Sequence, residues 1–406
     1  MPHLSDRVQC TFQSPFRKFL PLAQQAKDRG IEVIHLNIGQ PDFEMPQGAM
    51  DGIKASTASF IPYGIAEGQL ALREAWCKYY ERFNIHIDYS QLIVTSGASE
   101  GIYFTLMGIA DQGDEIIVPE PFYANYNGFS EMAGVEIVPL PSSIEDGFPI
   151  PDTAAFEAAI TPRTKGILIS NPNNPSGKIY DEGTLRALAA LAVKHDIFLL
   201  VDEAYSEFVY EGKRFFSALC IEGAEAHIVV IDSISKRFNA CGTRVGALAS
   251  RNTDLLQEIA RYARLRLCPP MLGQAFALHA LQLPGDYHDS VREEFSKRRA
   301  VVLERLNEIP DVVYHAPEGA FYLFVRLPID DSDRFCAWLL TDFDHQGKTV
   351  MLSPGTGFYA TPDMGKDEVR IAYILSSELL SEAMDCLEHA LTVYPGATKL
   401  SRASLV

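Results

Sequence analysis

One lysine of this sequence stands where covalent chemistry is possible. Lys236 follows the apolar run His227–Ile231 and lies close to two small hydroxyl residues, Ser233 and Ser235. A lysine just past a core strand can lose part of its hydration, which lowers the pKa of its ammonium group, and the neutral amine can form a Schiff base. A hydrated surface lysine is the commoner interpretation of any single lysine, so Lys236 needs support from its surroundings.

An acidic residue ends another apolar run. Asp202 comes directly after Phe198–Val201, and Tyr205 follows three residues later. A buried carboxylate is costly unless a cation pairs with it, so this position suits an acid that holds a cationic group. Capping of a following helix is the competing interpretation, and the residues alone leave both open.

Two more apolar runs end in small or amide residues. Leu92–Thr95 is followed by the sequence SGASEG, which opens a predicted helix, and small residues there can expose N–H groups to a phosphate. Gly166–Ile169 is followed by SNPNNPSG, an irregular loop that can present the amide of Asn174 to a ligand. A tight turn explains either segment taken alone, and neither matches the nucleotide motifs G-x-G-x-x-G or Walker A.

These residues need a sheet that brings them together. Short apolar runs predict strands at Leu92–Thr95, Glu115–Val118, Glu136–Pro139, Gly166–Ile169, Phe198–Val201, His227–Ile231 and Val245–Ala249. Helical patterns lie between several of them, at Ser99–Ala110, Tyr123–Ala133, Asp181–His195 and Thr253–Arg266. This alternation predicts an α/β domain with a largely parallel, buried sheet. Because ligands bind beyond the carboxyl ends of such strands, reactive groups that follow those ends are the candidates for a binding site.

The two ends of the chain predict a smaller α+β domain. The expected strands are Glu32–Asn37, Ala320–Val325, Thr349–Leu352 and Glu368–Ala372, and the expected helices are Val291–Ile309 and Ser377–Val393. We expect residues 1–45 to form an N-terminal arm and part of this small domain, residues 46–290 the large ligand-binding domain, and residues 291–406 the small C-terminal domain.

The net charge of −18 and the pI near 5.0 argue against a nucleic-acid partner and against attraction to an anionic membrane. The seven cysteines form no C-x-x-C pair, so we expect reduced thiols rather than disulfides or a zinc site. Residues 1–17 lack the pattern of a secretory signal, and the longest apolar runs are strand-sized. We therefore expect a cytoplasmic protein with no membrane partner.

The conjunction of these segments is more specific than any one of them. The order SGASEG, SNPNNPSG, Asp202-Glu203-Ala204-Tyr205 and Ser233-x-Ser-Lys236, followed by Gly-x-Arg244-x-Gly, resembles the fold-type I pyridoxal-phosphate enzymes. Specifically, it is similar to the class I/II aminotransferases of the aspartate-aminotransferase-like branch, from about Ser14 to Ala390. That resemblance implies an α/β fold whose large domain carries a mixed, mostly parallel seven-stranded sheet flanked by helices, beside a smaller α+β domain.

The resemblance also implies roles for the cofactor pyridoxal 5'-phosphate. Lys236 would hold it as a Schiff base and later move the proton at the substrate Cα, while Asp202 would pair with the pyridine nitrogen. Asn174 and Tyr205 would hydrogen-bond the ring oxygen, and Tyr123 would stack on the ring. The implied phosphate ligands are Gly97, Ala98, Ser99, Ser233, Ser235, Arg244 and, from a neighbouring subunit, Tyr63. A homodimer is therefore expected.

For the substrate, the resemblance implies that Arg370 clamps the α-carboxylate, with Gly39 and Asn174 beside it. The expected reaction is ping-pong transfer of an amino group between an L-amino acid and a 2-oxo acid, with 2-oxoglutarate as acceptor. The alternative is a lyase or decarboxylase on the same scaffold. A non-catalytic binding protein is disfavoured because Lys236, Asp202 and Arg370 are all present.

The side chain of the substrate stays open at this point. Arg17, Arg264 and Arg266 are candidates to bind a second carboxylate, although each is also explained as a surface or packing charge. Some aspartate-specific relatives carry a lysine at the position of Ser99, which this chain lacks. An apolar or mixed pocket is the other possibility, and its candidate residues are Phe16, Ile38, Phe321 and Tyr359. Aspartate and broad or aromatic specificity are both compatible with these residues.

Overall fold

The computed structural model describes residues 2–5, 8–9, 11–55 and 61–398 of the 406-residue chain. Within that part, seven strands form one sheet in the order β2-β8-β7-β6-β5-β3-β4. Their bounds are β2 Leu92–Thr95, β3 Glu115–Pro119, β4 Glu136–Leu140, β5 Thr164–Ser170, β6 Phe198–Asp202, β7 Ile228–Ser233 and β8 Gly246–Ala249. The predicted mixed, mostly parallel seven-stranded sheet is confirmed.

The direction of the strands decides where their ends lie. The pairs from β4 through β3, β5 and β6 to β7 are parallel. β8 is antiparallel to both β7 and β2, so β2 again runs in the direction of β7. The carboxyl ends of β2, β5, β6 and β7 therefore lie at one edge of the sheet, where all four chemically interesting segments begin.

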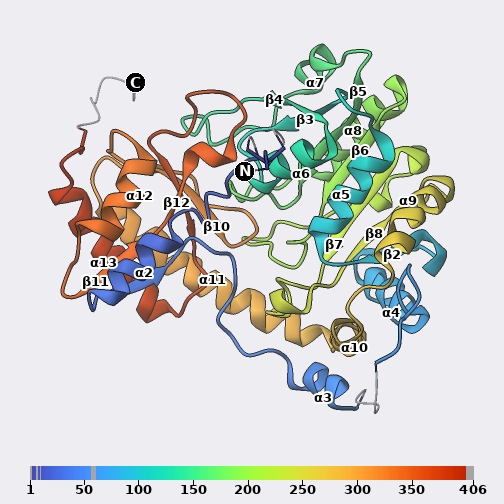
Figure 1. Ribbon diagram of the computed structural model, residues 1–406, viewed down its shortest axis with the longest axis horizontal. Coiled ribbons are helices and arrows are strands. Elements are labelled where there is room, and N and C mark those ends of the chain that lie inside the picture. The colour runs from blue at the N-terminus through green and yellow to red at the C-terminus, as the bar shows by residue number, and fades with distance from the viewer. Residues whose placement is uncertain (1, 6–7, 10, 56–60, 399–406) are drawn as a thin grey trace.

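Helices cover both faces of this sheet (Figure 1). Alternate residues of each strand point to opposite sides, so Leu199 and Val201 pack in one core while Leu200 packs in another. The first core includes residues of α4 Leu70–Tyr80, α8 Glu182–His195 and α10 Met271–Ala280; the second includes residues of α5 Ala98–Ile109, α6 Asn125–Ala133 and α9 Thr253–Arg266. Two further helices are α3 Gln47–Ala55 and α7 Thr153–Ala159.

A second group of elements joins the two ends of the chain. β1 Glu32–His35 pairs in parallel with β11 Lys348–Met351. Nearby lies an antiparallel sheet of β12 Ser353–Pro354, β13 Glu368–Ala372, β10 Tyr322–Arg326 and β9 Val313–Tyr314. The helices here are α2 Leu20–Asp28, α11 Gly285–Glu308, α12 Ser332–Thr341 and α13 Ser377–Val393. Figure 1 shows the blue α2 among the orange and red elements, as expected for a smaller α+β unit.

Several element boundaries differ from the sequence prediction, and two of these differences have a clear structural reason. α11 begins at Gly285 rather than Val291, because its first turn follows Pro284 and lacks the apolar periodicity that marks the rest of the helix. β10 begins at Tyr322 rather than Ala320, because Ala320 has a φ of +56°, which is outside the extended region.

The described residues contain six free cysteines, namely Cys77, Cys220, Cys241, Cys268, Cys336 and Cys386, while Cys10 lies outside them. No group of three or more His, Cys, Asp or Glu side chains in the described ranges is arranged to hold a metal ion. None of the helices described here is long and apolar enough to cross a membrane.

Candidate active site

Lys236 follows β7 and points towards the N-terminal segment. Its Nζ donates a hydrogen bond to the carbonyl oxygen of Gly39 at 2.7 Å and lies 3.8 Å from the Sγ of Cys241. Burial lowers the pKa of Lys236, but the neighbouring Tyr322, Cys241 and Tyr123 together hold that pKa above its ordinary value. The expectation of a lowered pKa from desolvation alone is therefore wrong for the protein without its ligand, because acidic hydroxyl and thiol groups surround the amine.

Asp202 is the last residue of β6 and is 4% exposed. Its carboxylate accepts hydrogen bonds from the Tyr126 hydroxyl and the Ala204 amide N–H, each at 3.1 Å. No lysine or arginine of the described residues forms an ion pair with it, and burial raises its pKa to about 6. It does not cap a helix, because residues 204–207 form turns. A cationic ligand group would relieve this buried carboxylate.

Arg370, on β13, is a buried cation without a carboxylate partner among the described residues. Its guanidinium donates to the Oδ1 of Asn174 at 3.0 Å and to the carbonyl oxygen of Asn37 at 2.6 Å. It also lies 4.3 Å from the ring centre of Phe16 and 4.2 Å from that of Tyr322. In the same described part, its Nε is buried without a hydrogen-bond partner. An uncompensated planar guanidinium with spare donors is suited to a carboxylate.

Tyrosines and an asparagine connect these groups. The Asn174 amide donates to the hydroxyl of Tyr205 at 3.4 Å, and that hydroxyl lies 2.9 Å from the hydroxyl of Tyr322. Gly39 fits against Tyr322 only because it lacks a side chain, since a Cβ there would lie 1.8 Å from the Tyr322 hydroxyl. Asn174, Tyr205 and Gly39 are thus brought together as expected, next to a tyrosine that sequence reasoning missed.

Tyr123 lies on the same side of the sheet edge. Its ring is stacked with Phe16 at a centroid distance of 6.1 Å and meets Tyr126 edge-on at 5.4 Å. Tyr126 was not predicted as a site residue. Its position three residues after Tyr123 is the sequence signal that could have indicated it. Tyr322 left no comparable signal, because it is one apolar-looking residue within a core strand.

The segment before α5 forms a narrow cradle with Arg244. Gly97, the N-cap of α5, has a φ of +79°, and a Cβ there would lie 2.3 Å from the Nη2 of Arg244. Ala98 and Ser99 form the first turn of α5, whose N–H groups carry partial positive charge. Arg244 donates to the Ser96 carbonyl at 3.2 Å. This close approach of backbone and guanidinium is suited to a phosphate.

Ser233 and Ser235 complete this edge of the sheet. Their hydroxyls lie 2.8 Å apart, and the Ser233 oxygen also accepts the amide N–H of Ser235 at 3.1 Å. Tyr63, by contrast, does not join the cluster within one chain, because 83% of its surface is exposed.

The candidates for substrate side-chain binding separate clearly. Arg264 pairs with Glu67 at 2.8 Å, and Arg266 pairs with Glu100 at 3.2 Å, so both have acidic partners. Arg17 is exposed. Phe321 is fully buried against Phe208 and Phe295 in the C-terminal core, and its ring meets that of Tyr205 edge-on at a centroid distance of 5.3 Å.

Of the remaining apolar candidates, Phe16 contacts Arg370 directly. Tyr359 instead donates a hydrogen bond to Glu368 at 2.6 Å. Ile38 is half-buried between Asn37 and Gly39. Phe16 is therefore the candidate that the structure brings to the guanidinium.

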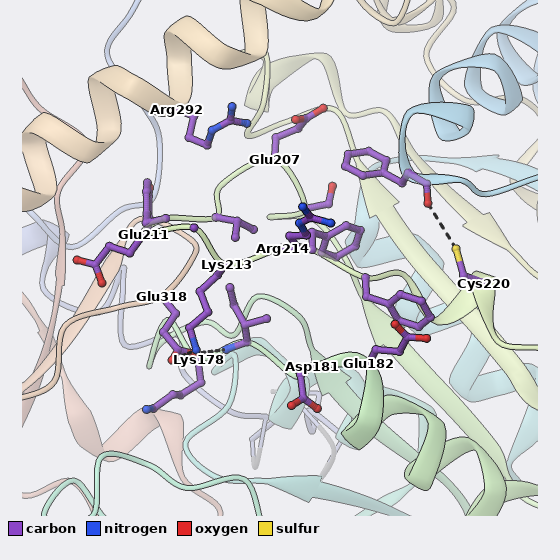
Figure 2. Close-up of a pocket in the computed structure, with 18 of the residues that line it drawn as sticks. Lys178, Asp181, Glu182, Glu207, Glu211, Lys213, Arg214, Cys220, Arg292 and Glu318 are labelled. Carbon is purple, nitrogen blue, oxygen red and sulfur yellow. Dashed lines mark hydrogen bonds and ion pairs between the residues drawn. The ribbon is translucent and has the colours of Figure 1, made fainter.

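A cleft of about 1640 Å³ opens elsewhere, and none of the residues predicted for the site lines it. Figure 2 shows its mixed acidic and basic lining, which includes Lys178, Glu207, Lys213 and Glu318. The candidate groups lie elsewhere, around Lys236 and Asp202 at the edge of the large sheet and Arg370 on β13.

Comparison with known proteins agrees with this arrangement. The family model described as "Aminotransferase class I and II" matches residues 31–387. The chain is 30% identical to an aspartate aminotransferase of Pyrococcus horikoshii, over 96% of this chain and 97% of that protein. It is 32% identical to aromatic-amino-acid aminotransferase 2 of Thermococcus litoralis, over 96% and 98%.

Solved structures give the same result. A Thermotoga maritima aspartate aminotransferase has a TM-score of 0.87 and 30% identity, covering 96% of this chain and all of that one. A Thermus thermophilus aspartate aminotransferase mutant has a TM-score of 0.87 and 29% identity, again over 96% and 100%. The chain therefore belongs to the class I and II aminotransferases and is a pyridoxal-phosphate-dependent transaminase.

Proposed function

We propose that this aminotransferase moves an amino group between an L-amino acid and a 2-oxo acid by a ping-pong scheme, with 2-oxoglutarate as acceptor. The observation that carries the proposal is Arg370, a buried guanidinium with no carboxylate partner among the described residues. It lies beside Asn37 and Tyr322, next to the segment that contacts Lys236. A substrate carboxylate on Arg370 would thus be held near the amine that handles the Cα proton.

The residues present fit pyridoxal phosphate. The buried carboxylate of Asp202 lacks a cationic partner among the described groups and would hold the protonated ring nitrogen. The cradle of Gly97 and Arg244 would hold the phosphate together with Ala98, Ser99, Ser233 and Ser235. Lys236 would form the Schiff base. When bound, the cofactor supplies an electron sink for the charge that develops at the substrate Cα.

The chain's own groups would then share the chemistry. Arg370 would orient the substrate through its α-carboxylate, helped by Asn174, whose Oδ1 already accepts from the guanidinium. Lys236, as a free amine, would remove the proton at the substrate Cα as general base. Tyr205 would hydrogen-bond the ring oxygen, and Tyr123 would cover the ring.

For the side chain of the amino-acid donor, we propose an aromatic or apolar group in preference to a second carboxylate. Phe16 presents its ring beside both Arg370 and Tyr123, and Phe358 meets Phe16 edge-on at 5.6 Å. Arg264 and Arg266 are paired with acids of the same chain. The similar proteins include one named for aromatic amino acids and several named for aspartate, so the contacts of Phe16 are what favours the first class.

The assembly is also a proposal. We propose a homodimer in the cytoplasm, in which Tyr63 reaches the phosphate of the partner's cofactor. Tyr63 is exposed, and so are the apolar Ile61, Ile65, Leu265 and Leu267, which a partner subunit would cover. We also propose the division into three parts, residues 1–45, 46–290 and 291–406. The pairing of β1 with β11 supports placing part of the N-terminal segment in the small C-terminal domain.

A half-reaction screen tests the function. Each amino acid is incubated with the holoenzyme without an acceptor, and the 2-oxo acid, ammonia and carbon dioxide released are measured. We expect about one equivalent of 2-oxo acid per site and no further turnover until 2-oxoglutarate is added. Continuous release of ammonia or carbon dioxide would instead identify a lyase or decarboxylase. Borohydride reduction should attach a pyridoxyl group to the peptide that contains Lys236, and a label elsewhere refutes its role.

A further inference from the structure

The loop that carries Lys236 is closed by a buried ion pair. Asp232, near the end of β7, and Arg237, directly after Lys236, are each 1% exposed, and their side chains form a close ion pair. Only four residues separate them, and these include Ser233, Ser235 and Lys236. The ion pair therefore joins the two ends of the segment that holds three proposed cofactor ligands.

The carboxylate of Asp232 also fixes the start of this loop. One of its oxygens accepts the amide N–H of Ser233 at 2.7 Å, and the other accepts the indole N–H of Trp76 at 3.1 Å. Ser233 in turn accepts the amide N–H of Ser235. A continuous series of hydrogen bonds thus runs from α4 through Asp232 into the loop, and the last of them holds the Ser233 hydroxyl against the backbone of Ser235.

Arg237 also packs against α4, the helix that carries Trp76. Its guanidinium lies 4.8 Å from the ring centre of Tyr79, whose hydroxyl donates to Glu207 at 2.6 Å. Glu207 also lies 3.5 Å from Arg82 and lines the cleft drawn in Figure 2. Among the described groups, the Nε and Nη1 of Arg237 are buried without hydrogen-bond partners. The arginine is therefore confined by packing and by one carboxylate.

A buried ion pair such as Asp232–Arg237 is not expected to add much to the stability of the fold. Apolar residues of similar volume often replace a buried ion pair without loss of stability, since desolvation offsets the attraction between the charges. What an ion pair can add is a single allowed geometry, and here that geometry belongs to the loop that carries Lys236. Arg237 touches neither substrate nor cofactor in the proposed site, so any effect on the reaction must act through its neighbour in the chain.

We propose that the Asp232–Arg237 ion pair is a positioning element, which orders the loop so that Ser233, Ser235 and the Lys236 amine face one cofactor. This inference rests on the proposed roles of those three residues. Without the pair, the folded loop would sample several conformations, and cofactor binding would have to order it again. The affinity for the cofactor and the rate of the chemical steps would both fall, while substrate binding at Arg370 would change little.

The test removes both charges together. The double variant Asp232→Asn, Arg237→Met retains an acceptor for Trp76 and leaves no unpaired buried charge. We expect the melting temperature of its apoprotein to stay within a few degrees of wild type. The dissociation constant for pyridoxal 5'-phosphate, measured on apoprotein by equilibrium dialysis, should rise at least ~10-fold, and kcat should fall up to ~100-fold with KM little changed. Amide exchange in the 232–237 peptide of the apoprotein should be faster.

Two matched variants separate positioning from general destabilisation. Arg299→Met removes another buried arginine, on α11, which pairs with Glu211 at 2.8 Å, and should leave the cofactor affinity unchanged. Arg237→Lys keeps a charge for Asp232 and should restore part of the cofactor affinity, which keeps the test readable if the double variant fails to fold.

The proposal is overturned if the folded double variant binds the cofactor as wild type does. It is equally overturned if Arg299→Met weakens binding as much, or if Arg237→Lys binds the cofactor no better than the folded double variant. Cofactor affinity does not depend on which reaction is catalysed. An enzyme that transaminates no amino acid would therefore refute the proposed function, while the cofactor affinities of the variants would still test the role of the ion pair.

Discussion

Arg370 and Arg237 are both buried arginines, but their surroundings differ in one respect. Arg237 has the carboxylate of Asp232 against it, whereas Arg370 has aromatic rings, an amide and a carbonyl oxygen, and no carboxylate among the described residues. A buried charge with its counter-ion in place belongs to the folded chain, while one without it is completed by a ligand. The comparison therefore separates the group proposed to hold the loop from the group proposed to hold the substrate.

Replacing Arg370 should have the largest effect on catalysis. In Arg370→Met, the substrate carboxylate loses its partner, and we expect kcat/KM to fall about 1,000-fold, or roughly 4 kcal/mol. Because no protein carboxylate is left unpaired, the free energy of unfolding of the apoprotein should stay the same or rise, as urea denaturation would measure. A variant that unfolds easily would show that Arg370 has a structural role similar to that of Arg237.

The single variant Arg237→Met should show the opposite pattern in stability. It leaves Asp232 buried without a cation, so the free energy of unfolding of the apoprotein should fall by about 3–5 kcal/mol. Urea denaturation of wild type, of this variant and of the double variant with Asp232→Asn measures the coupling between the two residues. If the double variant is no more stable than the single one, the ion pair is not what holds this loop.

Asp202 is the acidic counterpart of Arg370, since it is a buried carboxylate without a cationic partner among the described residues. Its pKa is raised from 3.8 to about 6, so the folded apoprotein binds a proton more tightly than the unfolded chain does. Stability from this group is present below pH 4 and is lost as the pH rises to about 6. Asp202→Asn should therefore stabilise the apoprotein by roughly 3 kcal/mol at pH 8 and by much less at pH 4, while transamination falls. Equal stabilisation at both pH values argues against the raised pKa.

A substitution of Phe16 tests which class of substrate side chain binds beside Arg370. In Phe16→Ala, we expect kcat/KM for an aromatic amino acid to fall ~10-fold relative to aspartate, because the ring that faces the substrate is lost. The measurement is the ratio of the two kcat/KM values, with 2-oxoglutarate as common acceptor. An unchanged ratio would place the side-chain subsite away from Phe16.

The smallest effect is expected for Arg264. Its side chain is 62% exposed and already paired with Glu67, so Arg264→Ala should change the ratio of aromatic to aspartate kcat/KM by no more than ~2-fold. A selective loss of aspartate activity would instead assign Arg264 to a second carboxylate, and the preference proposed from Phe16 would then be wrong.

Much of the fold could be predicted because it depends on local patterns. The strands of the large sheet and helices such as α9 and α13 follow apolar periodicity, and their predicted bounds agree within a few residues. The edge at which Asp202, Asn174, Lys236 and Gly97 lie follows from strand direction, once the sheet is largely parallel.

Contacts between distant segments could not be predicted in this way. Tyr322 reaches Tyr205 across 117 residues, and Trp76 reaches Asp232 across 156 residues. Nothing in the local sequence of Tyr322 or Trp76 distinguishes either residue from an ordinary core aromatic. The sequence left Arg266 as a candidate to bind the substrate, but in the folded chain it pairs with Glu100.

The sequence by itself determined the element order, the strand ends that carry chemistry and the set of residues that resembles an aminotransferase. Only the tertiary structure decided which charges are satisfied. Apart from the family resemblance, nothing in their sequence neighbours separates Arg370, beside Val369 and Ile371, from Arg237, beside Phe238. Whether a buried charge meets a carboxylate depends on side chains that converge from separate elements, because electrostatic energy depends on distance and burial rather than on position along the chain.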